Sequence, residues 1–293
     1  MQKNFDTVVH FQPHFMQSGG SSTYIIELIS QFKKLGIKSQ VFTIAVPKRI
    51  RDEYKDIEFI EVGGKLTSSI FYWLFFPLFI LRLIILFYKY SKGNLILSHA
   101  FPSAWWASIL TFFFPVSHIW VSHDPNYFLY NSEFFSSFNG ITRFVANTMR
   151  HFLKYLDQLL FKRISLIVAN SKFLKSKIEY IYPELPKIVI ISPGINHKIF
   201  FDKKLKRDID IITIGRLSRY KNTHSLIEAI KLLTKELPSV NVLIIGEGEE
   251  RQKLIGLVKK NKLTSQITFT GDIKNKKILA NHINRSKIFI SLS

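Results

Sequence analysis

The chain has 293 residues, enough for two domains with cores, and its 47% hydrophobic and 21% charged residues argue against a disordered, collagen-like or polytopic membrane protein. It has no cysteine, which excludes disulfides, thiol nucleophiles and cysteine-ligated zinc or iron–sulfur sites. The formal net charge of +20 is spread along the sequence and forms no basic tail, so it suits anionic membranes or phosphorylated substrates as well as nucleic acid.

The first two thirds of the chain alternate strand-like and helical patterns. Residues 5–11 are predicted as a buried strand that begins without an apolar leader, so we expect no secretion. The glycine loop 18–21 follows, and residues 22–35 form an amphipathic helix that Gly36 ends as a C′ glycine would. Further strands are predicted over residues 41–45, 57–62, 95–98, 118–122, 166–170 and 188–192.

The alternation restarts after a polar, basic stretch at 197–208. Strands are predicted over residues 209–214, 240–245, 266–270 and 287–291, and helices over 223–236, 249–262 and 274–285. Strands that are separated by helical crossovers predict parallel sheets covered on both faces. We therefore expect an α/β protein with two doubly wound domains, residues 1–200 and 201–293.

Residues 70–88 form an apolar segment that only Pro77 and Arg82 interrupt, and it is long enough to span a bilayer. Spanning would place the strands before residue 62 and those after residue 95 on opposite sides of the membrane, which one parallel sheet does not permit. The alternatives are a helix packed on the sheet and a helix lying at the membrane interface. Lys65, Lys89 and Lys92 flank the segment without a clear positive-inside asymmetry.

Residues 141–163 form a second amphipathic helix, with apolar residues at helical spacing and basic residues around it. One interpretation is a helix packed on its own sheet. The other is reversible attachment to an anionic membrane leaflet, in which the aromatic runs Trp105-Trp106 and 112–114 would take part.

Gly19 and Gly20 lie between the first strand and the first helix, where doubly wound sheets bind ligands. Glycines at this point let the backbone approach a phosphate, and the helix N-terminus favours its negative charge. A plain turn is the alternative. The pair lacks the G-x-G-x-x-G spacing, so no nicotinamide or flavin site is predicted.

The strand ends of the second domain carry similar loops. The first strand leads into Gly215 and Arg216 with Lys221 five residues later, the next ends in Gly246-Glu247-Gly248, and the third ends in Gly271. A guanidinium and an ammonium group at a strand end can neutralise a diphosphate. Three such loops in succession favour a nucleotide-binding shelf, although each basic residue taken alone could be a solvated surface charge.

The ordered set of motifs resembles the retaining glycosyltransferases of family 4, which have the GT-B fold of two Rossmann-like domains facing a cleft. The resemblance covers nearly the whole chain. The motifs are the Gly-Gly loop, Val121-Ser122-His123-Asp124, Ala169-Asn170-Ser171-Lys172, Ser192-Pro193-Gly194-Ile195-Asn196 with Phe200, Gly215-Arg216-Leu217 with Lys221, and Gly246-Glu247-Gly248.

This resemblance implies a nucleotide-sugar donor bound mainly by the second domain and an acceptor bound mainly by the first. Arg216 and Lys221 would hold the donor diphosphate and stabilise the leaving group, Gly20 would let the backbone approach the phosphates, and His123 would contact the donor sugar near the reacting centre. No metal, cofactor, side-chain nucleophile or general base is implied. His10, His14 and His118 are expected to be structural.

One departure from the family pattern concerns a glutamate pair. Family members follow the strand matching residues 288–291 with a glycine-containing loop and two glutamates separated by seven residues, whereas this sequence ends at Ser293. We therefore expect a truncated second domain with an unpaired sheet edge. The alternative to a glycosyltransferase is a non-catalytic or split-enzyme subunit that binds a nucleotide, a membrane or a partner chain supplying the C-terminal part.

The aromatic, basic first domain favours an acceptor at a membrane, such as a lipid-linked saccharide or polysaccharide precursor. We expect a cytoplasmic protein attached to the anionic inner face of the cell membrane. Nucleic-acid binding is not expected, because the sequence has no recognition-helix or stacking-platform pattern.

Overall fold

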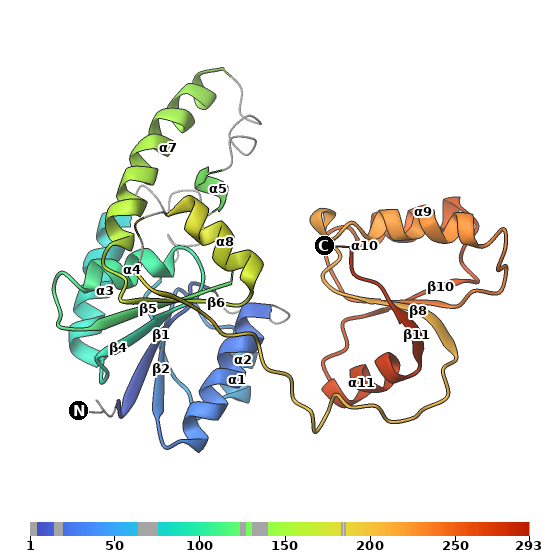
Figure 1. Ribbon diagram of the computed structural model, residues 1–293, viewed down its shortest axis with the longest axis horizontal. Coiled ribbons are helices and arrows are strands. Elements are labelled where there is room, and N and C mark those ends of the chain that lie inside the picture. Colours follow the sequence, from blue (N-terminus) through green and yellow to red (C-terminus); the bar gives the residue numbers. More distant parts are fainter. Residues whose placement is uncertain are drawn as a thin grey trace. The chain divides into compact units, whose positions relative to one another are not determined.

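The computed structural model describes residues 5–14, 20–63, 76–123, 127–130, 140–182, 184 and 186–292. The chain divides into two compact units, Met1–Pro193 and Gly194–Ser293. The predicted boundary at residue 200 lies in the same connection, between the last strand of the first sheet and the first strand of the second. Each unit is a parallel sheet with helices on both faces, so the predicted α/β architecture is confirmed (Figure 1).

The first unit contains a seven-stranded parallel sheet in the order β3-β2-β1-β4-β5-β6-β7. Its strands are β1 (Thr7–Phe11), β2 (Lys38–Thr43), β3 (Glu58–Glu61), β4 (Leu95–Ser98), β5 (Ser117–Ser122), β6 (Leu166–Ala169) and β7 (Ile188–Ile190). The strand order reverses at β1, because β2 and β3 continue on one side of it and β4 on the other. In open α/β sheets, ligands bind outside the carboxyl ends of the strands at such a switch point.

Helices cover both faces of this sheet (Figure 1). Those on one face are α1 (Gly20–Lys34) and α2 (Lys48–Glu53); those on the other are α3 (Phe76–Tyr90), α4 (Ser103–Leu110), α7 (Gly140–Phe161) and α8 (Lys172–Ile181), and the short α5 (Tyr127–Tyr130) packs on α7. Successive side chains of each strand point to opposite faces of the sheet, so apolar residues of one strand enter the cores on both faces. Val8 and Leu97 face α1, whereas Val9 and Ile96 face α3 and α4.

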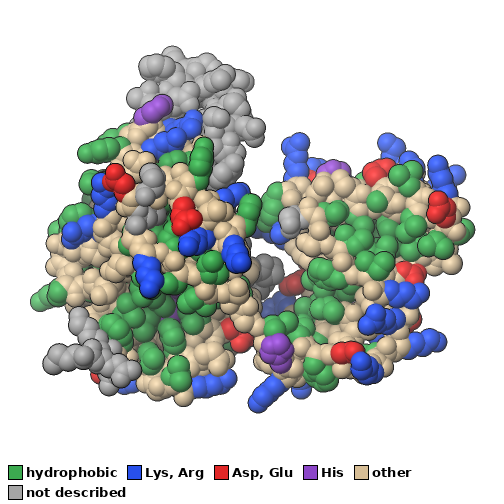
Figure 2. All heavy atoms as spheres, in the orientation of Figure 1, with side chains coloured by type: hydrophobic (Ala, Val, Ile, Leu, Met, Phe, Trp, Pro, Cys, Tyr) green, Lys and Arg blue, Asp and Glu red, His purple; other side chains and the backbone are tan. Residues whose placement is uncertain are grey.

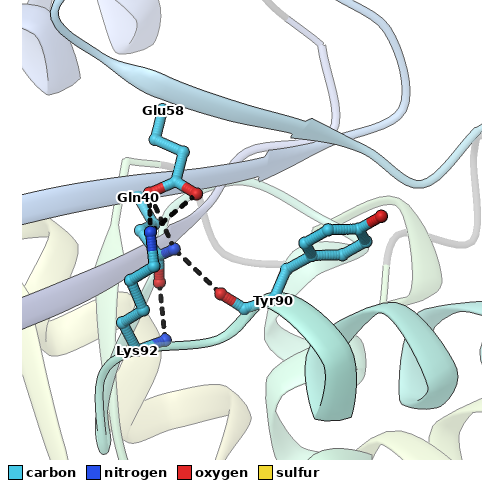
Figure 3. Close-up of polar contacts among 4 residues, drawn as sticks. All are labelled: Gln40, Glu58, Tyr90 and Lys92. Carbon is cyan, nitrogen blue, oxygen red and sulfur yellow. Dashed lines mark hydrogen bonds and ion pairs between the residues drawn. The ribbon is translucent and has the colours of Figure 1, made fainter.

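The buried side-chain amide of Gln40 joins β2 to β3 and to the end of α3, away from the carboxyl ends of the strands (Figure 3). The Gln40 side chain on β2 donates to a Glu58 carboxylate oxygen on β3 (3.0 Å) and to the Tyr90 carbonyl at the end of α3 (3.0 Å). Its oxygen accepts from the Lys92 amide (2.8 Å), and the Lys92 ammonium lies 3.0 Å from Glu58. Because both ends of the amide are bonded, Gln40 can be buried without an unsatisfied polar group.

The apolar segment predicted over 70–88 is a helix from Phe76 onward, and residues 70–75 lie outside the described residues. Phe79, Leu83 and Phe87, spaced four residues apart, are buried in the core against β1, β2 and β4. One face of α3 therefore packs on the sheet. In the part of the chain that the structure describes, no helix combines the length and apolarity that crossing a membrane requires.

The prediction that Trp105 and Trp106 take part in membrane attachment is wrong. Both indoles are buried, 1% and 0% exposed, because seven of the eight residues of α4 are enclosed between the sheet, α3 and α7. In the neighbouring run, Phe114 packs on Phe87 with ring centroids 5.0 Å apart. Only Phe112 and Phe113 of that run are exposed.

The second unit contains a four-stranded parallel sheet in the order β10-β9-β8-β11. Its strands are β8 (Ile209–Ile214), β9 (Val242–Ile245), β10 (Ile267–Gly271) and β11 (Ser286–Phe289). Its helices are η3 (Arg219–Lys221), α9 (Thr223–Leu233), α10 (Arg251–Lys260) and α11 (Lys276–Asn284). Helices α9 and α10 pack on one face of the sheet and α11 packs on the other, as predicted for a doubly wound unit.

Candidate functional site

The carboxyl ends of three neighbouring strands in the second unit are followed by the glycine-bearing loops that the sequence analysis singled out. We call residues 215–218, 246–250 and 271–272 the strand-end loops. Three main-chain hydrogen bonds join them, from the amide of Gly246 to Gly271 (2.9 Å), from Leu217 to Glu247 (2.9 Å) and from Glu250 to Leu217 (3.0 Å), and the Gly215 amide donates to Ile245 at the end of β9 (3.0 Å). The loops therefore continue the hydrogen bonding of the sheet beyond its strands.

Two of these glycines are required by close backbone approach. A Cβ on Gly246 would lie 1.9 Å from the Gly215 carbonyl oxygen, and a Cβ on Gly248 would lie 2.2 Å from the Leu217 carbonyl oxygen. Gly246 also has φ of +146°, a conformation that residues with a side chain rarely adopt. Gly215 is different, because a Cβ there would meet open space, so local packing does not explain its glycine.

The two predicted diphosphate-binding cations lie on the loop after β8. Arg216 is exposed, and its Nε lies 3.7 Å from a carboxylate oxygen of Glu249. Lys221 ends the short helix η3, and its ammonium lies 5.4 Å from the centre of the Tyr220 ring. Asn222 then takes the left-handed conformation (φ 55°), which asparagine tolerates, and α9 begins at the next residue.

Glu247 contacts its neighbours at the strand-end loops through both its backbone and its side chain. Its carbonyl accepts from the Leu217 amide, and its Oε1 lies 3.3 Å from Nε of Arg251, the first residue of α10. A Cβ on Gly271 would lie 2.8 Å from the same Oε1. The predicted residues Gly215, Arg216, Gly246, Glu247, Gly248 and Gly271 thus belong to one bonded set of loops, with Lys221 on the adjoining η3.

In the first unit, Gly20 is the first residue of α1, and a Cβ there would meet nothing within 4 Å. Gly19 lies outside the described residues. The open space next to Gly20 is compatible with a ligand approaching the N-terminus of α1, the arrangement that favours anions.

His123 immediately follows β5 and is one of three histidines that lie together beneath α1. Its ring stacks on that of His99, with centroids 5.8 Å apart, and the Tyr24 ring meets it edge-on at 4.9 Å. His99, immediately after β4, has Nε2 3.1 Å from Nδ1 of His10 on β1. At that distance, one ring donates its N–H to the other.

Burial keeps this histidine cluster neutral at pH 7. Burial lowers the pKa of His10 from 6.5 to about 3, and it also lowers the pKa of the less buried His123. The pKa of His99 falls well below its usual value, first through burial and then through repulsion from His10 and His123. Each ring therefore carries one N–H donor and one acceptor nitrogen.

His118 is buried just as deeply but is fully bonded, as expected for a structural residue. Its Nε2 lies 2.7 Å from the Ser98 hydroxyl and its Nδ1 lies 3.2 Å from the Ser108 hydroxyl. In the cluster, by contrast, Nε2 of His10, Nδ1 of His99 and Nε2 of His123 have no hydrogen-bond partner among the described residues. His14, outside the cluster, is exposed beyond β1.

His99 and Tyr24 were not singled out from the sequence. Alternation along the strands contains a signal for His99, because it follows Leu97 by two residues just as His10 follows Val8 and His123 follows Val121. All three valine and leucine side chains lie in the core under α1. The missing information was that β1, β4 and β5 are neighbours in the sheet.

A buried carboxylate on α7 bonds residues of three other helical segments in the first unit. Asp157 on α7 is fully buried and accepts from Nε1 of Trp105 (2.5 Å), the Tyr130 hydroxyl (2.9 Å) and the Tyr182 hydroxyl (2.5 Å). These residues come from α4, α5 and the end of α8. Asp157 therefore joins four helical segments on one side of the sheet.

The described residues contain no group of three or more His, Asp or Glu side chains placed to hold a metal ion. The chemistry that the described groups can supply is binding of anions by fixed cations and backbone amides in the second unit, and hydrogen bonding by neutral imidazoles in the first.

Two family models together match most of the chain. The model described as Glycosyltransferase Family 4 matches residues 18–199, and the model described as Glycosyl transferases group 1 matches residues 196–293. The two matches meet in the connection between β7 and β8.

The curated relatives are similar over part of their length. An uncharacterised glycosyltransferase of Methanocaldococcus jannaschii is 31% identical over 175 residues, which are 56% of this chain and 44% of that protein. The GtfA subunit of a UDP-N-acetylglucosamine–peptide N-acetylglucosaminyltransferase of Streptococcus parasanguinis is 37% identical over 75 residues, 26% of this chain and 15% of that protein. The aligned parts thus span less than half of each relative.

Solved structures of GT-B glycosyltransferases share the fold. Sucrose-phosphate synthase from Thermosynechococcus elongatus has a TM-score of 0.73 at 18% identity, covering 97% of this chain and 74% of that one. HepE from Anabaena, in complex with UDP and glucose, has a TM-score of 0.67 at 16% identity, covering 93% and 71%. At these identities the likeness establishes the GT-B type of fold.

Proposed function

The chain belongs to glycosyltransferase family 4, and from this premise we propose that it transfers a sugar from a nucleotide-sugar donor to an acceptor, with retention of configuration at the transferred carbon. The observation that carries the proposal is the bonded set of strand-end loops in the second unit. Their backbones approach one another so closely that only glycine fits at residues 246 and 248, and they carry Arg216 and adjoin Lys221 at the end of η3.

Such a set of loops suits a donor diphosphate. Gly215 leaves open space beside the backbone at the end of β8, and positive charge comes from Arg216 on the same loop and from Lys221 on the adjoining η3. As the bond from the sugar to the diphosphate breaks, negative charge builds up on the leaving oxygen, and fixed cations stabilise it. The complexes of HepE with UDP and glucose support a nucleotide-sugar as the donor class.

For the first unit we propose the acceptor side of the reaction. His123 is half-buried at the carboxyl end of β5. Its neutral imidazole can donate a hydrogen bond to a sugar hydroxyl or accept one from it. We assign to it the contact with the donor sugar that the family resemblance implies. The proton of the acceptor hydroxyl goes to a diphosphate oxygen, so no side-chain base is required.

We further propose that the acceptor is a lipid-linked saccharide and that the first unit attaches to the anionic inner leaflet of the cell membrane. Helix α3 has a second apolar face, opposite the one buried on the sheet, and Phe112 and Phe113 lie near its end because Phe114 packs on Phe87. We call this the outer apolar face; its residues and exposed fractions are Leu78 (63%), Leu81 (55%), Ile85 (56%), Tyr88 (82%), Phe112 (55%) and Phe113 (61%).

Positive charge accompanies the outer apolar face. Arg82 and Lys89 are exposed on α3, and the Arg163 guanidinium lies 4.3 Å from the centre of the Phe112 ring. Apolar side chains beside cations are the combination that binds anionic leaflets. On the face of the molecule shown in Figure 2, Lys and Arg side chains are scattered over both units instead of forming one basic stripe, which does not favour nucleic acid.

Transfer is tested by incubating the protein with labelled nucleotide sugars of several bases and with lipid extracts. We expect label in the lipid phase with at least one donor, together with release of the nucleoside diphosphate. The control is a variant that lacks both Arg216 and Lys221. If the folded protein binds nucleotide but transfers no label, the alternative of a non-catalytic or split-enzyme subunit replaces the enzyme.

A further inference from the structure

The three histidines at the carboxyl ends of β1, β4 and β5 form a chain of contacts that ends at His123. Each occupies the next inward position after an aliphatic residue of the core under α1, namely Val8, Leu97 and Val121. At this end of the sheet, imidazoles thus replace the aliphatic side chains. Burying polar rings costs free energy unless their nitrogens are hydrogen-bonded. The presence of three imidazoles side by side therefore points to a functional role.

His99 occupies the middle of this chain. Its Nε2 lies 3.1 Å from Nδ1 of His10, and its ring lies within 20° of parallel to the rings of His10 and His123, with centroids 5.4 Å and 5.8 Å apart. Both His10 and His99 are 0% exposed. The His10–His99 hydrogen bond therefore fixes the plane of the ring against which His123 rests.

Tyr24 on α1 makes the second ring contact with His123. Its ring meets His123 at 4.9 Å and an interplanar angle of 75°, and it also lies edge-on to His99 at 6.3 Å. His123 thus has ring contacts on two sides. The ring is held in place while one of its buried nitrogens, Nε2, has no hydrogen-bond partner among the described residues.

We infer that His10 and His99 are positioning residues, which hold the ring of His123 in one orientation through the hydrogen bond between them and the stack of His99 on His123. The inference rests on the proposed function, in which His123 contacts the donor sugar. Small displacements of a contacting group reduce rates strongly, so loss of the stack should lower turnover roughly ten- to hundredfold.

The experiment combines imidazole nitrogen spectra with kinetics on the full chain. In His99→Ala, the His123 resonances should move and broaden because the ring exchanges between orientations and tautomers. His99→Phe keeps a ring against His123 but loses the hydrogen bond to His10, so it should restore the His123 signal and the turnover only in part. If His99 instead bound the sugar directly through a nitrogen, phenylalanine would not restore turnover, and the positioning role would be overturned.

His118→Asn is the matched control. It removes an equally buried imidazole from β5, but one that points to the opposite face of the sheet and bonds Ser98 and Ser108. It should cost stability while leaving the His123 resonances in place. A His123 signal that is unchanged in His99→Ala, or that moves as much in His118→Asn, would contradict the inference.

Two further readouts separate this inference from the proposed function. Affinity for the nucleoside diphosphate should be unchanged in His99→Ala, because the cations assigned to the diphosphate are Arg216 and Lys221; the loss should fall on kcat. If the wild-type protein transfers no sugar, the proposed function fails. The nitrogen spectra still decide whether His10 and His99 orient His123, since they need no substrate.

Discussion

The indole N–H of Trp105 donates to Oδ1 of Asp157 across 2.5 Å, which joins α4 to α7. The other carboxylate oxygen accepts from the hydroxyls of Tyr130 and Tyr182, so one buried side chain receives hydrogen bonds from three aromatic residues. Tyr130 lies on α5, seven residues after His123 in the sequence. The position of that segment thus depends on a residue of α7.

Asp157→Asn should destabilise the first unit by roughly 2 kcal/mol or more, because an amide nitrogen would replace an acceptor that faces an N–H or O–H donor. The measurement is urea unfolding followed by tryptophan fluorescence. All four tryptophans belong to the first unit, so the signal reports that unit. Gln158→Asn, at an exposed position of the same helix, should leave the midpoint unchanged.

Gly246→Ala should unfold the strand-end loops or displace them, because the added Cβ would lie 1.9 Å from the Gly215 carbonyl oxygen at φ of +146°. We expect a loss of at least about 2 kcal/mol in stability, measured by circular dichroism, together with loss of nucleotide binding. Gly256→Ala on α10 is the control, since its Cβ meets open space, and alanine in a helix should stabilise by roughly 0.5–1 kcal/mol. Equal behaviour of the two variants would refute the assigned close approach.

Acid should destabilise the first unit at a pH well above that at which carboxylates titrate. Burial holds the pKa of His10 and of His118 at about 3, whereas unfolding returns each to about 6.5. Below pH 6.5 the unfolded chain therefore binds protons that the folded chain does not, and stability falls as pH falls. Above pH 6.5 these two histidines do not affect the free energy of unfolding, and between pH 6.5 and pH 3 they lower it progressively.

This loss amounts to as much as about 1.4 kcal/mol for each such histidine and pH unit. Urea midpoints at pH 7.5, 6.5 and 5.5, again followed by tryptophan fluorescence, measure it. The slope between pH 6.5 and 5.5 should be shallower in His118→Asn, which removes one of the groups. A wild-type midpoint that is constant across this range would contradict the neutral, buried state of these rings.

Leu81→Glu combined with Ile85→Glu should reduce binding to anionic vesicles by about tenfold or more, because both changes place carboxylates on the outer apolar face. Vesicle flotation measures the bound fraction. Leu232→Glu, at an exposed leucine of α9 in the second unit, introduces the same chemistry elsewhere and should leave binding intact. Binding that both sets of variants reduce equally would argue for non-specific electrostatic attraction.

The sequence predicted the alternation of strands and helices well, because buried parallel strands are short apolar runs with polar ends. The predicted ranges 95–98 and 209–214 coincide with β4 and β8, and Gly36 has the positive φ of a C′ glycine. Helix α4 was not predicted. It is enclosed on almost every side, so its sequence has no amphipathic period, and its aromatic residues suggested a surface.

The candidate site was predictable where its parts are neighbours in sequence. The strand-end loops each carry their glycines and charges within a few residues. The histidine cluster was not predictable as a whole, because His10 and His99 meet only through the order β1-β4-β5 in the sheet. Side-chain packing determines which nitrogens of each imidazole are hydrogen-bonded. His118 therefore differs from the cluster in having both nitrogens bonded, which the sequence alone does not show.

Binding of UDP-sugars and UDP to the wild-type chain and to the Arg216→Ala, Lys221→Ala double variant, measured by titration calorimetry with other nucleoside diphosphates in parallel, tests the central claim most directly. Lys231→Ala, on the exposed side of α9, controls for loss of charge. The account predicts that the wild-type and control proteins bind one class of nucleoside diphosphate and that the folded double variant binds it at least about tenfold more weakly, as expected when charge-assisted contacts are lost. Equal affinity in all three proteins, or no binding by the folded wild type, would contradict it.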